Sequence, residues 1–210
     1  LSKEIATSMR GRNLSYTLFP LSFREFLLFK KFKFQKVYSS NEKAYLLNYF
    51  GDYLNFGGYP ESVLYTPERE KILRDIFDTA ILKDVLERHK VRNSFLMKNL
   101  IKALLSAKEF SINKFYNYLK SQQIKSSKDA LYKYLDYLEE AFFIFCLNKF
   151  NLSYKKAEQS LPKIYFIDNG LLTINGISDK GRLLENLVFI ELLRRNLNVR
   201  YYKTVSDEEV

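Results

Sequence analysis

The 210-residue chain is 47% hydrophobic and has a formal net charge of +10, with a sequence pI of about 9.4. It is long enough to bury a substantial core in one or two domains. Its single cysteine, Cys146, excludes an internal disulfide framework and indicates a reducing compartment, so we expect a cytoplasmic protein. No apolar run approaches a membrane span and no signal peptide is visible, so we expect no membrane partner. The positive charge favours nucleic acid.

The N-terminal part of the chain predicts a helix, a strand and a second helix. A short helix is expected over residues 2–9, and alternating apolar residues over 14–18 predict a strand. Ser22 and Glu25 then have the spacing of a capping box, in which each side chain satisfies a backbone amide of the other residue. This box predicts a helix over residues 23–32.

A long helix is predicted after Thr66 and Pro67, because threonine is a good N-cap and proline suits the first helical position. The lone histidine, His89, lies beside Arg88 and Lys90 near the end of this helix. We interpret it as a solvated residue at a helix end rather than as a metal ligand.

Three amphipathic helices and two strands are predicted next and follow one another closely in the sequence. The helices are expected over residues 95–105, 111–119 and 126–138, with the hydroxyl of Ser126 capping the third helix. The strands are expected over residues 142–147 and 163–168, and Cys146 is interpreted as a small buried residue of the first strand. Helix, helix, helix, strand, loop and strand is the order of a winged helix.

Several segments resemble prokaryotic P-loop ATPases of the AAA superfamily that carry a C-terminal domain of unknown function. The resemblance rests on SKEIATSMRGRNLSYTLFPLSFREFL, YLNFGGYPESV, ILKDVLERHKVRN, SSKDALYKYLDYLEEAFFIF, KIYFIDNGLL and KGRLLENLVFIELLRR, which occur here in the order of that family. It implies a mainly α (α+β) chain with four parts. These are the end of an ATPase core (1–22), a helical lid (23–90), a winged helix (91–168) and the start of a nuclease-like α/β domain (169–210).

The phosphate-binding loop of these ATPases is not found in this sequence. Gly57 and Gly58 form the nearest glycine pair, and Tyr-Pro follows them instead of Lys-Thr. We therefore expect a fragment of a longer protein, with ATP and Mg²⁺ bound by the parent and no cofactor in the fragment itself. The resemblance places Arg10 and Arg12 where an arginine senses a γ-phosphate, and the alternative is that they cap a helix C-terminus.

DNA is the partner that we expect for the winged helix, whose third helix usually enters the major groove by its N-terminal end. The acidic residues Asp136, Glu139 and Glu140 would limit this contact to the first two turns. The candidate contacts are Lys114, Lys125, Ser126, Ser127, Lys128, Tyr132 and Lys133. The alternatives are that the winged helix contacts a partner protein, or that the chain self-associates through the ATPase core.

The C-terminal segment resembles the start of a nuclease-like domain of the PD-(D/E)XK kind. Glu185, in Gly-Arg-Leu-Leu-Glu-Asn, matches the helix glutamate of that pattern and is the candidate metal ligand. The aspartate and lysine that would complete the site are not in this chain, so a structural role for Glu185 is the alternative. The expected function is to couple the nucleotide state of the parent to contact with DNA or a protein. A remnant of a metal-dependent nuclease is the second hypothesis.

Overall fold

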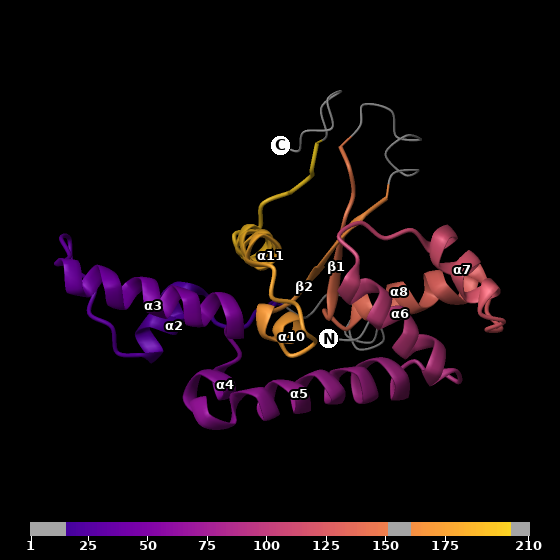
Figure 1. Ribbon diagram of the computed structural model, residues 1–210, viewed down its shortest axis with the longest axis horizontal. Coiled ribbons are helices and arrows are strands. Elements are labelled where there is room, and N and C mark those ends of the chain that lie inside the picture. Colours follow the sequence, from indigo (N-terminus) through magenta and orange to yellow (C-terminus); the bar gives the residue numbers. More distant parts are fainter. Residues whose placement is uncertain (1–15, 151–160, 203–210) are drawn as a thin grey trace, which may run out of the picture.

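The computed structural model describes residues 16–150 and 161–202, and these residues form a mainly helical structure with one two-stranded sheet (Figure 1). The expected mainly α (α+β) class is therefore confirmed. The helices before residue 90 are α2 (Phe23–Phe29), α3 (Ser40–Phe56), α4 (Pro60–Leu64), η1 (Thr66–Glu68), α5 (Arg69–Thr79) and η2 (Ala80–Glu87). The later elements are α6 (Ser94–Ser106), α7 (Ile112–Ser121), α8 (Lys128–Glu140), β1 (Ile144–Leu147), β2 (Lys163–Phe166), α10 (Asn169–Thr173) and α11 (Lys180–Arg194).

The capping box at the start of α2 is confirmed. The hydroxyl of Ser22 accepts from the amide of Glu25, and the Glu25 carboxylate accepts from the amide of Ser22 at 2.7 Å. The helix is three residues shorter than predicted and ends at Phe29, followed by Lys31 with a φ of 57°. A left-handed residue cannot continue a right-handed helix.

The strand predicted over residues 14–18 is wrong for the part that the structure describes. Residues 16–19 are irregular, and the side chains of Tyr16 and Leu18 are 81% and 91% exposed. The alternation of apolar and polar residues was not sufficient for a strand, because neither β1 nor β2 pairs with this segment. The helix predicted over residues 2–9 lies outside the described residues.

One long helical rod forms from Thr66 to Glu87, as predicted, but in three sections. Thr66 is part of the 3₁₀ turn η1 and its side chain makes no capping bond, whereas Pro67 occupies the first turn. The regular helix α5 follows and widens into the π-helix η2. At its start, Arg69 pairs with Asp52 of α3 and lies 4.3 Å above the ring of Phe56.

His89 is not solvated as predicted. Its ring stacks on that of Tyr137 in α8, with the centroids 3.9 Å apart and an angle of 9° between the planes. The imidazole Nε2 also lies 3.9 Å from a carboxylate oxygen of Glu140. The prediction failed because a position beyond a helix end is solvated only when no later element packs there, and α8 does.

The three helices α6, α7 and α8 form in the predicted order and each has a polar N-cap. Asn93, Ser111 and Ser127 accept from the third backbone amide of their helices. The predicted cap of α8, Ser126, is therefore wrong by one residue. The apolar stripes face inward, with Leu104, Leu119 and Leu131 fully buried.

The strands β1 and β2 pair in an antiparallel hairpin in which Ile144 faces Phe166 and Leu147 faces Lys163. The segment between α6 and α7 joins the other edge of β2, since the amide of Phe110 donates to the carbonyl of Pro162 at 3.0 Å. β1 starts two residues later than predicted because Phe142 adopts a left-handed φ of 54° in the turn after α8, and β2 ends two residues early because Asp168 caps the next helix, α10. Cys146 is half-buried.

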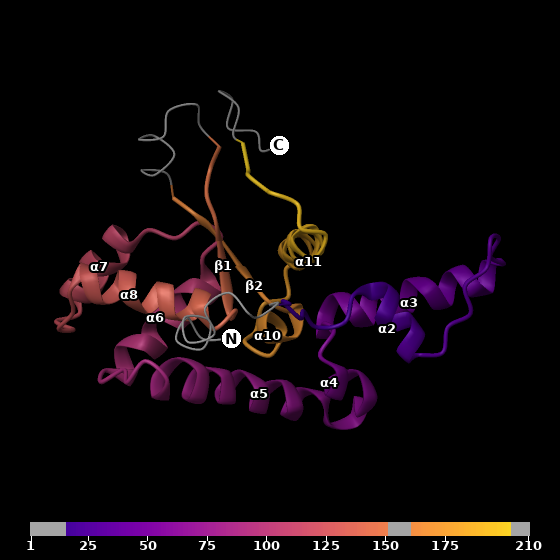
Figure 2. The ribbon, with the colours of Figure 1, turned by 180° about the vertical axis from the view of Figure 1, so that it is seen from behind.

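The hairpin lies between α11 on one side and the α6–α8 bundle on the other (Figures 1 and 2). Tyr165 stacks on Phe189 of α11 at 4.0 Å, whereas Phe166 packs against Phe143 in the main core.

The main core extends across the predicted domain boundaries at residues 90 and 168. It contains Leu54 and Val85 from the predicted lid, the leucines of α6–α8, and Leu171 and Leu183 from the C-terminal segment. A separate small cluster holds α2, α3 and α4 together around Phe26 and Tyr53. Within residues 16–150 and 161–202, no helix has both the length and the apolar character needed to cross a membrane.

Candidate functional site

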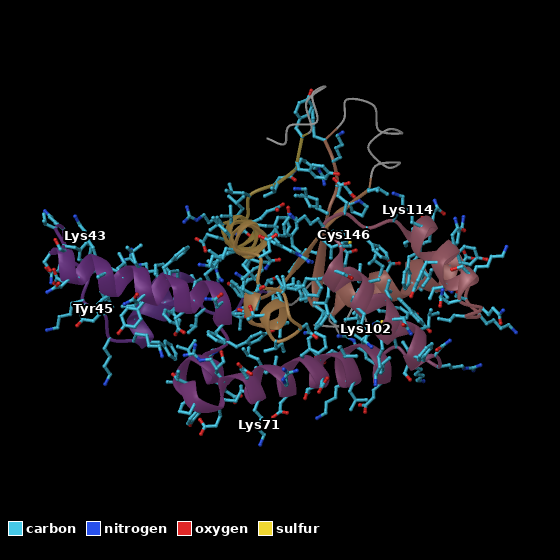
Figure 3. The ribbon with its side chains drawn as sticks, in the orientation of Figure 1. Lys43, Tyr45, Lys71, Lys102, Lys114 and Cys146 are labelled. Carbon is cyan, nitrogen blue, oxygen red and sulfur yellow. The ribbon has the colours of Figure 1, made fainter. Side chains whose placement is uncertain are left out.

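The residues predicted to contact DNA lie on α7, α8 and the turn between them. These two helices pack against each other at one end of the molecule, opposite α3 (Figure 1). Lys114 on α7 and Lys43 on α3 mark the two ends in Figure 3. The structure thus brings together all seven candidates on neighbouring elements.

The turn before α8 fixes the positions of the central candidates. Ser127 caps the helix, its hydroxyl accepting from the amide of Ala130 at 3.2 Å. The hydroxyl of Ser126 is buried and has no hydrogen-bond partner among the described residues, so it is not a surface contact. Lys125 is exposed, whereas the ammonium group of Lys128 lies 5.7 Å above the ring of Tyr116 on α7.

The lysines of this surface are available for an external anion. Lys114, Lys125 and Lys133 are exposed, and the ion pairs of the described part of the chain do not include them. Tyr132 on α8 is 51% exposed. An uncompensated cation at a surface attracts phosphate over a distance of about 10 Å at moderate salt.

Of the acidic residues at the far end of α8, only Glu139 points back into the fold, whereas Glu140 stays exposed. The Glu139 carboxylate accepts from the amide of Cys146 at 2.9 Å, and Glu140 lies beside His89. Burial, together with the charge of Glu139, raises the pKa of the Cys146 thiol, so that this cysteine stays protonated and unreactive. Asp136 remains exposed.

Glu185, the other predicted site residue that the structure describes, lies apart from this surface (Figure 1). Arg10 and Arg12 lie outside the described residues. Glu185 is on α11, where its carboxylate accepts from Lys163 at 2.7 Å and from the hydroxyl of Tyr165 at 2.8 Å. Burial opposes ionisation, but these two bonds hold the pKa of Glu185 below its usual range. In residues 16–150 and 161–202, no group of three acidic, histidine or cysteine side chains could hold a metal ion.

A buried carboxylate, Asp168, joins segments that are far apart in the sequence. The amide of Gly58 donates to one of its oxygens at 2.7 Å, and the amide of Gly170 donates to the other at 2.8 Å. The residue is only 6% exposed. Burial raises the pKa of Asp168 to about 7, although both amide bonds act to lower it.

Gly57 and Gly58 are glycines because no side chain fits at either position. Gly57 has a φ of 71°, and a Cβ atom there would lie 1.7 Å from a carboxylate oxygen of Asp168. A Cβ atom on Gly58 would lie 2.2 Å from the carbonyl oxygen of Leu21. In this chain the glycine pair therefore packs closely against a carboxylate and a backbone carbonyl.

Two buried asparagines extend the contacts of Asp168 into a polar network. Asn186 of α11 bonds both the amide and the carbonyl of Phe166, at 2.8 and 2.9 Å, and also donates to the side-chain oxygen of Asn169. Asn169 in turn donates to the carbonyls of Leu54 and Leu183 at 2.8 Å. We call Gly57, Gly58, Asp168, Asn169 and Asn186 the polar junction.

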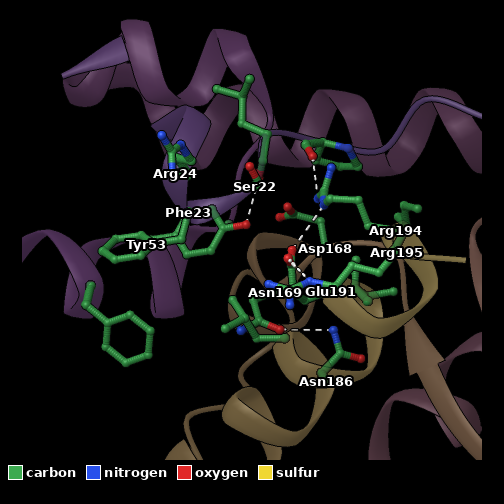
Figure 4. A pocket seen from close by; sticks show the side chains of 17 residues that line it. Ser22, Phe23, Arg24, Tyr53, Asp168, Asn169, Asn186, Glu191, Arg194 and Arg195 are labelled. Carbon is green, nitrogen blue, oxygen red and sulfur yellow. Dashed lines mark hydrogen bonds and ion pairs between the residues drawn. The ribbon is translucent and has the colours of Figure 1, made fainter. Parts of the chain in front are cut away.

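A cavity of about 450 Å³ opens beside the polar junction (Figure 4). Asp168, Asn169 and Asn186 line it from the C-terminal segment, and Ser22, Phe23 and Tyr53 line it from α2 and α3. Arg194 also lines it, donating to the carbonyl of Pro20 at 2.7 Å and lying 3.3 Å from a carboxylate oxygen of Glu191. Most of the polar side chains that line the cavity make hydrogen bonds or ion pairs with other residues of the chain.

The polar junction was not predicted from the sequence. Its signals were present, since Asp168 and Asn169 directly follow an apolar strand and Asn186 shares the helical spacing of the apolar residues Leu183, Phe189 and Ile190. Buried polar residues need partners, but no spacing rule says which of them are partners.

Residues 47–180, more than half of the chain, match the family described as a domain of unknown function, DUF8612. The chain belongs to the DUF8612 family. The matched region contains α7, α8 and four of the five residues of the polar junction, leaving out Asn186.

Two uncharacterized proteins are similar to this DUF8612 chain over 99% of its length. One, from Methanocaldococcus jannaschii, is 45% identical, and the aligned region is 49% of that protein. The other, from Haemophilus influenzae, is 35% identical over 52% of its own length. The chain thus spans about half the length of these relatives. No solved structure matches it.

Proposed function

We propose that this chain is the C-terminal portion of an AAA-type ATPase, and that its winged helix binds DNA. The winged helix would consist of α6, α7 and α8 with the hairpin β1–β2. The order of these elements supports the proposal, as does the bond from Phe110 to Pro162 that joins the helices to the hairpin.

The observation that carries the proposal is the exposed basic surface at the start of α8. Lys125 and Lys128 flank the capped N-terminus of the helix, with Lys114 on the neighbouring helix. Helix N-termini attract anions through their free amides and dipole, and the lysines add full charges at the same end. A phosphate backbone is the polyanion that such a surface suits best.

We propose that a change of nucleotide state is transmitted to this surface through the polar junction. ATP and Mg²⁺ would be bound by a part of the whole protein outside these 210 residues. A movement of the lid (residues 23–90, α2 to η2) would displace Gly58, which is bonded to Asp168 two residues after β2. Because β2 is part of the hairpin, the displacement would pass directly to the winged helix.

A second candidate function is contact with a partner protein. It is favoured by the charge of α8 itself, where Asp129, Asp136 and Glu140 are exposed and repel phosphates. A remnant of a metal-dependent nuclease has less support, since the Glu185 carboxylate is already bonded to Lys163 and Tyr165.

Binding to a fluorescein-labelled random duplex, measured by anisotropy across a salt series, tests the proposal. Affinity should fall steeply with salt, because each neutralised phosphate contributes about 0.9 to the slope of log K against log salt. The Lys125→Ala/Lys128→Ala variant should lose about two phosphate contacts, which lowers the magnitude of this slope by about 1.8.

Lys43→Ala/Lys71→Ala is the matched control, since it removes the same charge from α3 and α5, away from the winged helix (Figure 3). It should bind the duplex almost as the unmodified chain does. If both variants lose the same affinity for the duplex, the effect comes from net charge and not from the winged-helix surface. If the unmodified chain does not bind the duplex even at low salt, contact with a partner protein becomes the favoured function.

A further inference from the structure

The segment from α7 to the start of α8 contains no acidic residue. Between Glu109 and Asp129 the sequence has four lysines, two asparagines, two glutamines and no carboxylate. The lysines are Lys114, Lys120, Lys125 and Lys128, and all are exposed. In a chain that holds 24 acidic residues among 210, a run of 19 residues without one marks a surface that can approach a polyanion closely.

The outward face of α7 has a defined arrangement. Ile112, Phe115 and Leu119 are buried, so the opposite side of the helix faces solvent. At 3.6 residues per turn, Asn113 and Asn117 lie one turn apart along the middle of that side. The same spacing puts Lys120 on one flank of this pair and Lys114 on the other.

The position of Lys128 extends the basic flank. Its ammonium group lies over the ring of Tyr116, which is one turn from Lys120 on the same side of α7. Lys128, at the start of α8, therefore places its charge beside α7 and not beyond the N-terminus of α8.

The outward face of α8 has the opposite character. Leu131, Leu135 and Leu138 are buried, and the residues opposite them are Asp129, Lys133, Asp136 and Glu140. Over Lys128–Glu140, two lysines stand against four acidic residues, a formal charge of −2. A helix with carboxylates along its outer face is repelled by the two phosphate backbones that border a groove.

We infer that α7, and not α8, is the helix that enters the major groove of a DNA duplex. An α-helix with its side chains is about 10–12 Å wide and fits the roughly 12 Å groove. Asn113 and Asn117 then face the base edges, where an asparagine amide can bond adenine through two hydrogen bonds. Lys114 and Lys120 face the two backbones, and Lys128 adds a further phosphate contact. The inference rests on the proposed binding of DNA and assigns the surface that performs it.

Three double variants of the whole chain test the assignment, each measured by anisotropy on a labelled duplex over a salt series. Lys114→Gln/Lys120→Gln should lower the slope of log K against log salt by about 1.8 and weaken binding about tenfold or more. Asn113→Ala/Asn117→Ala should keep the slope but weaken binding to a duplex selected from a random pool more than binding to the pool itself. Tyr132→Ala/Lys133→Ala, on α8, should lower the salt slope and the affinity less than Lys114→Gln/Lys120→Gln does.

The outcomes separate this inference from the proposed function. If the α8 variant loses binding and the two α7 variants keep it, DNA binding stands and the assignment to α7 is wrong. If the unmodified chain does not bind the duplex, both are wrong. All six positions are exposed, and equal melting temperatures and helix signals in circular dichroism confirm that the variants are folded.

Discussion

Gly57 lies so close to Asp168 that even a methyl group has no room between them. An added Cβ atom would be 1.7 Å from the carboxylate, and the φ of 71° is unfavourable for any residue with a side chain. At the scale of the single residue, this contact explains the glycine better than any requirement for flexibility does.

Gly57→Ala is therefore expected to lower the free energy of unfolding by roughly 2 kcal/mol or more. Gly51→Ala, inside the helix α3 that Gly57 follows, is the control, because a Cβ atom at Gly51 meets nothing within 4 Å. It should raise the free energy by about 0.5–1 kcal/mol, as alanine does in a helix interior. Urea unfolding of both variants measures the difference, and similar values for the two would contradict the close contact.

At the scale of the element, α8 shows how a helix boundary depends on one hydroxyl. Ser126 and Ser127 are adjacent and chemically identical, so the sequence does not distinguish them as caps. The structure does, because only the hydroxyl of Ser127 accepts from a backbone amide at the start of the helix.

Ser127→Ala should lower the free energy of unfolding by about 1 kcal/mol, the usual cost of removing an N-cap. Ser126→Ala should have little effect or a small stabilising one, because it removes a buried hydroxyl without a partner in the described structure. The comparison by urea unfolding decides which serine caps the helix. A larger loss for Ser126→Ala would restore the prediction from the sequence.

Most helices could be predicted because their determinants are local. The capping box of Ser22 and the apolar stripes of α6, α7 and α8 act within a few residues, and they formed where expected. The polar junction could not be predicted, because Gly58 and Asp168 are 110 residues apart and become partners only through the packing of α3 against α10. The stacking of His89 on Tyr137 was not predicted either, because it too depends on the packing of elements that are distant in the sequence.

At the scale of the whole molecule, Asp168 links global stability to pH. Its folded pKa of about 7 lies above the ordinary aspartate value of 3.8, so between these values the folded state holds a proton that the unfolded state has lost. The unfolded state then binds fewer protons, and the free energy of unfolding falls as pH rises. The stabilisation that comes from the raised pKa of Asp168 is fully present below about pH 4 and is lost as the pH rises through 7.

The free energy of unfolding should therefore fall between pH 5 and pH 8 by roughly 1.4 kcal/mol for each pH unit below the folded pKa of Asp168. In Asp168→Asn this component should vanish, although the variant should be less stable overall because an amide offers one acceptor to two donors. Asp75→Asn, at an exposed position of α5, should keep the full slope. Urea unfolding at four pH values gives the slopes, and parallel curves for Asp168→Asn and the unmodified chain would refute the assignment.

The stack of His89 on Tyr137 also gives the protein a built-in spectroscopic probe. Because the sequence has one histidine, its proton NMR spectrum contains one pair of imidazole C–H resonances. The ring current of Tyr137, 3.9 Å away, shifts both resonances upfield of those of a free imidazole. A rearrangement that separates the turn after η2 from α8 moves them back downfield, so the contact between this turn and α8 can be followed in the unlabelled protein.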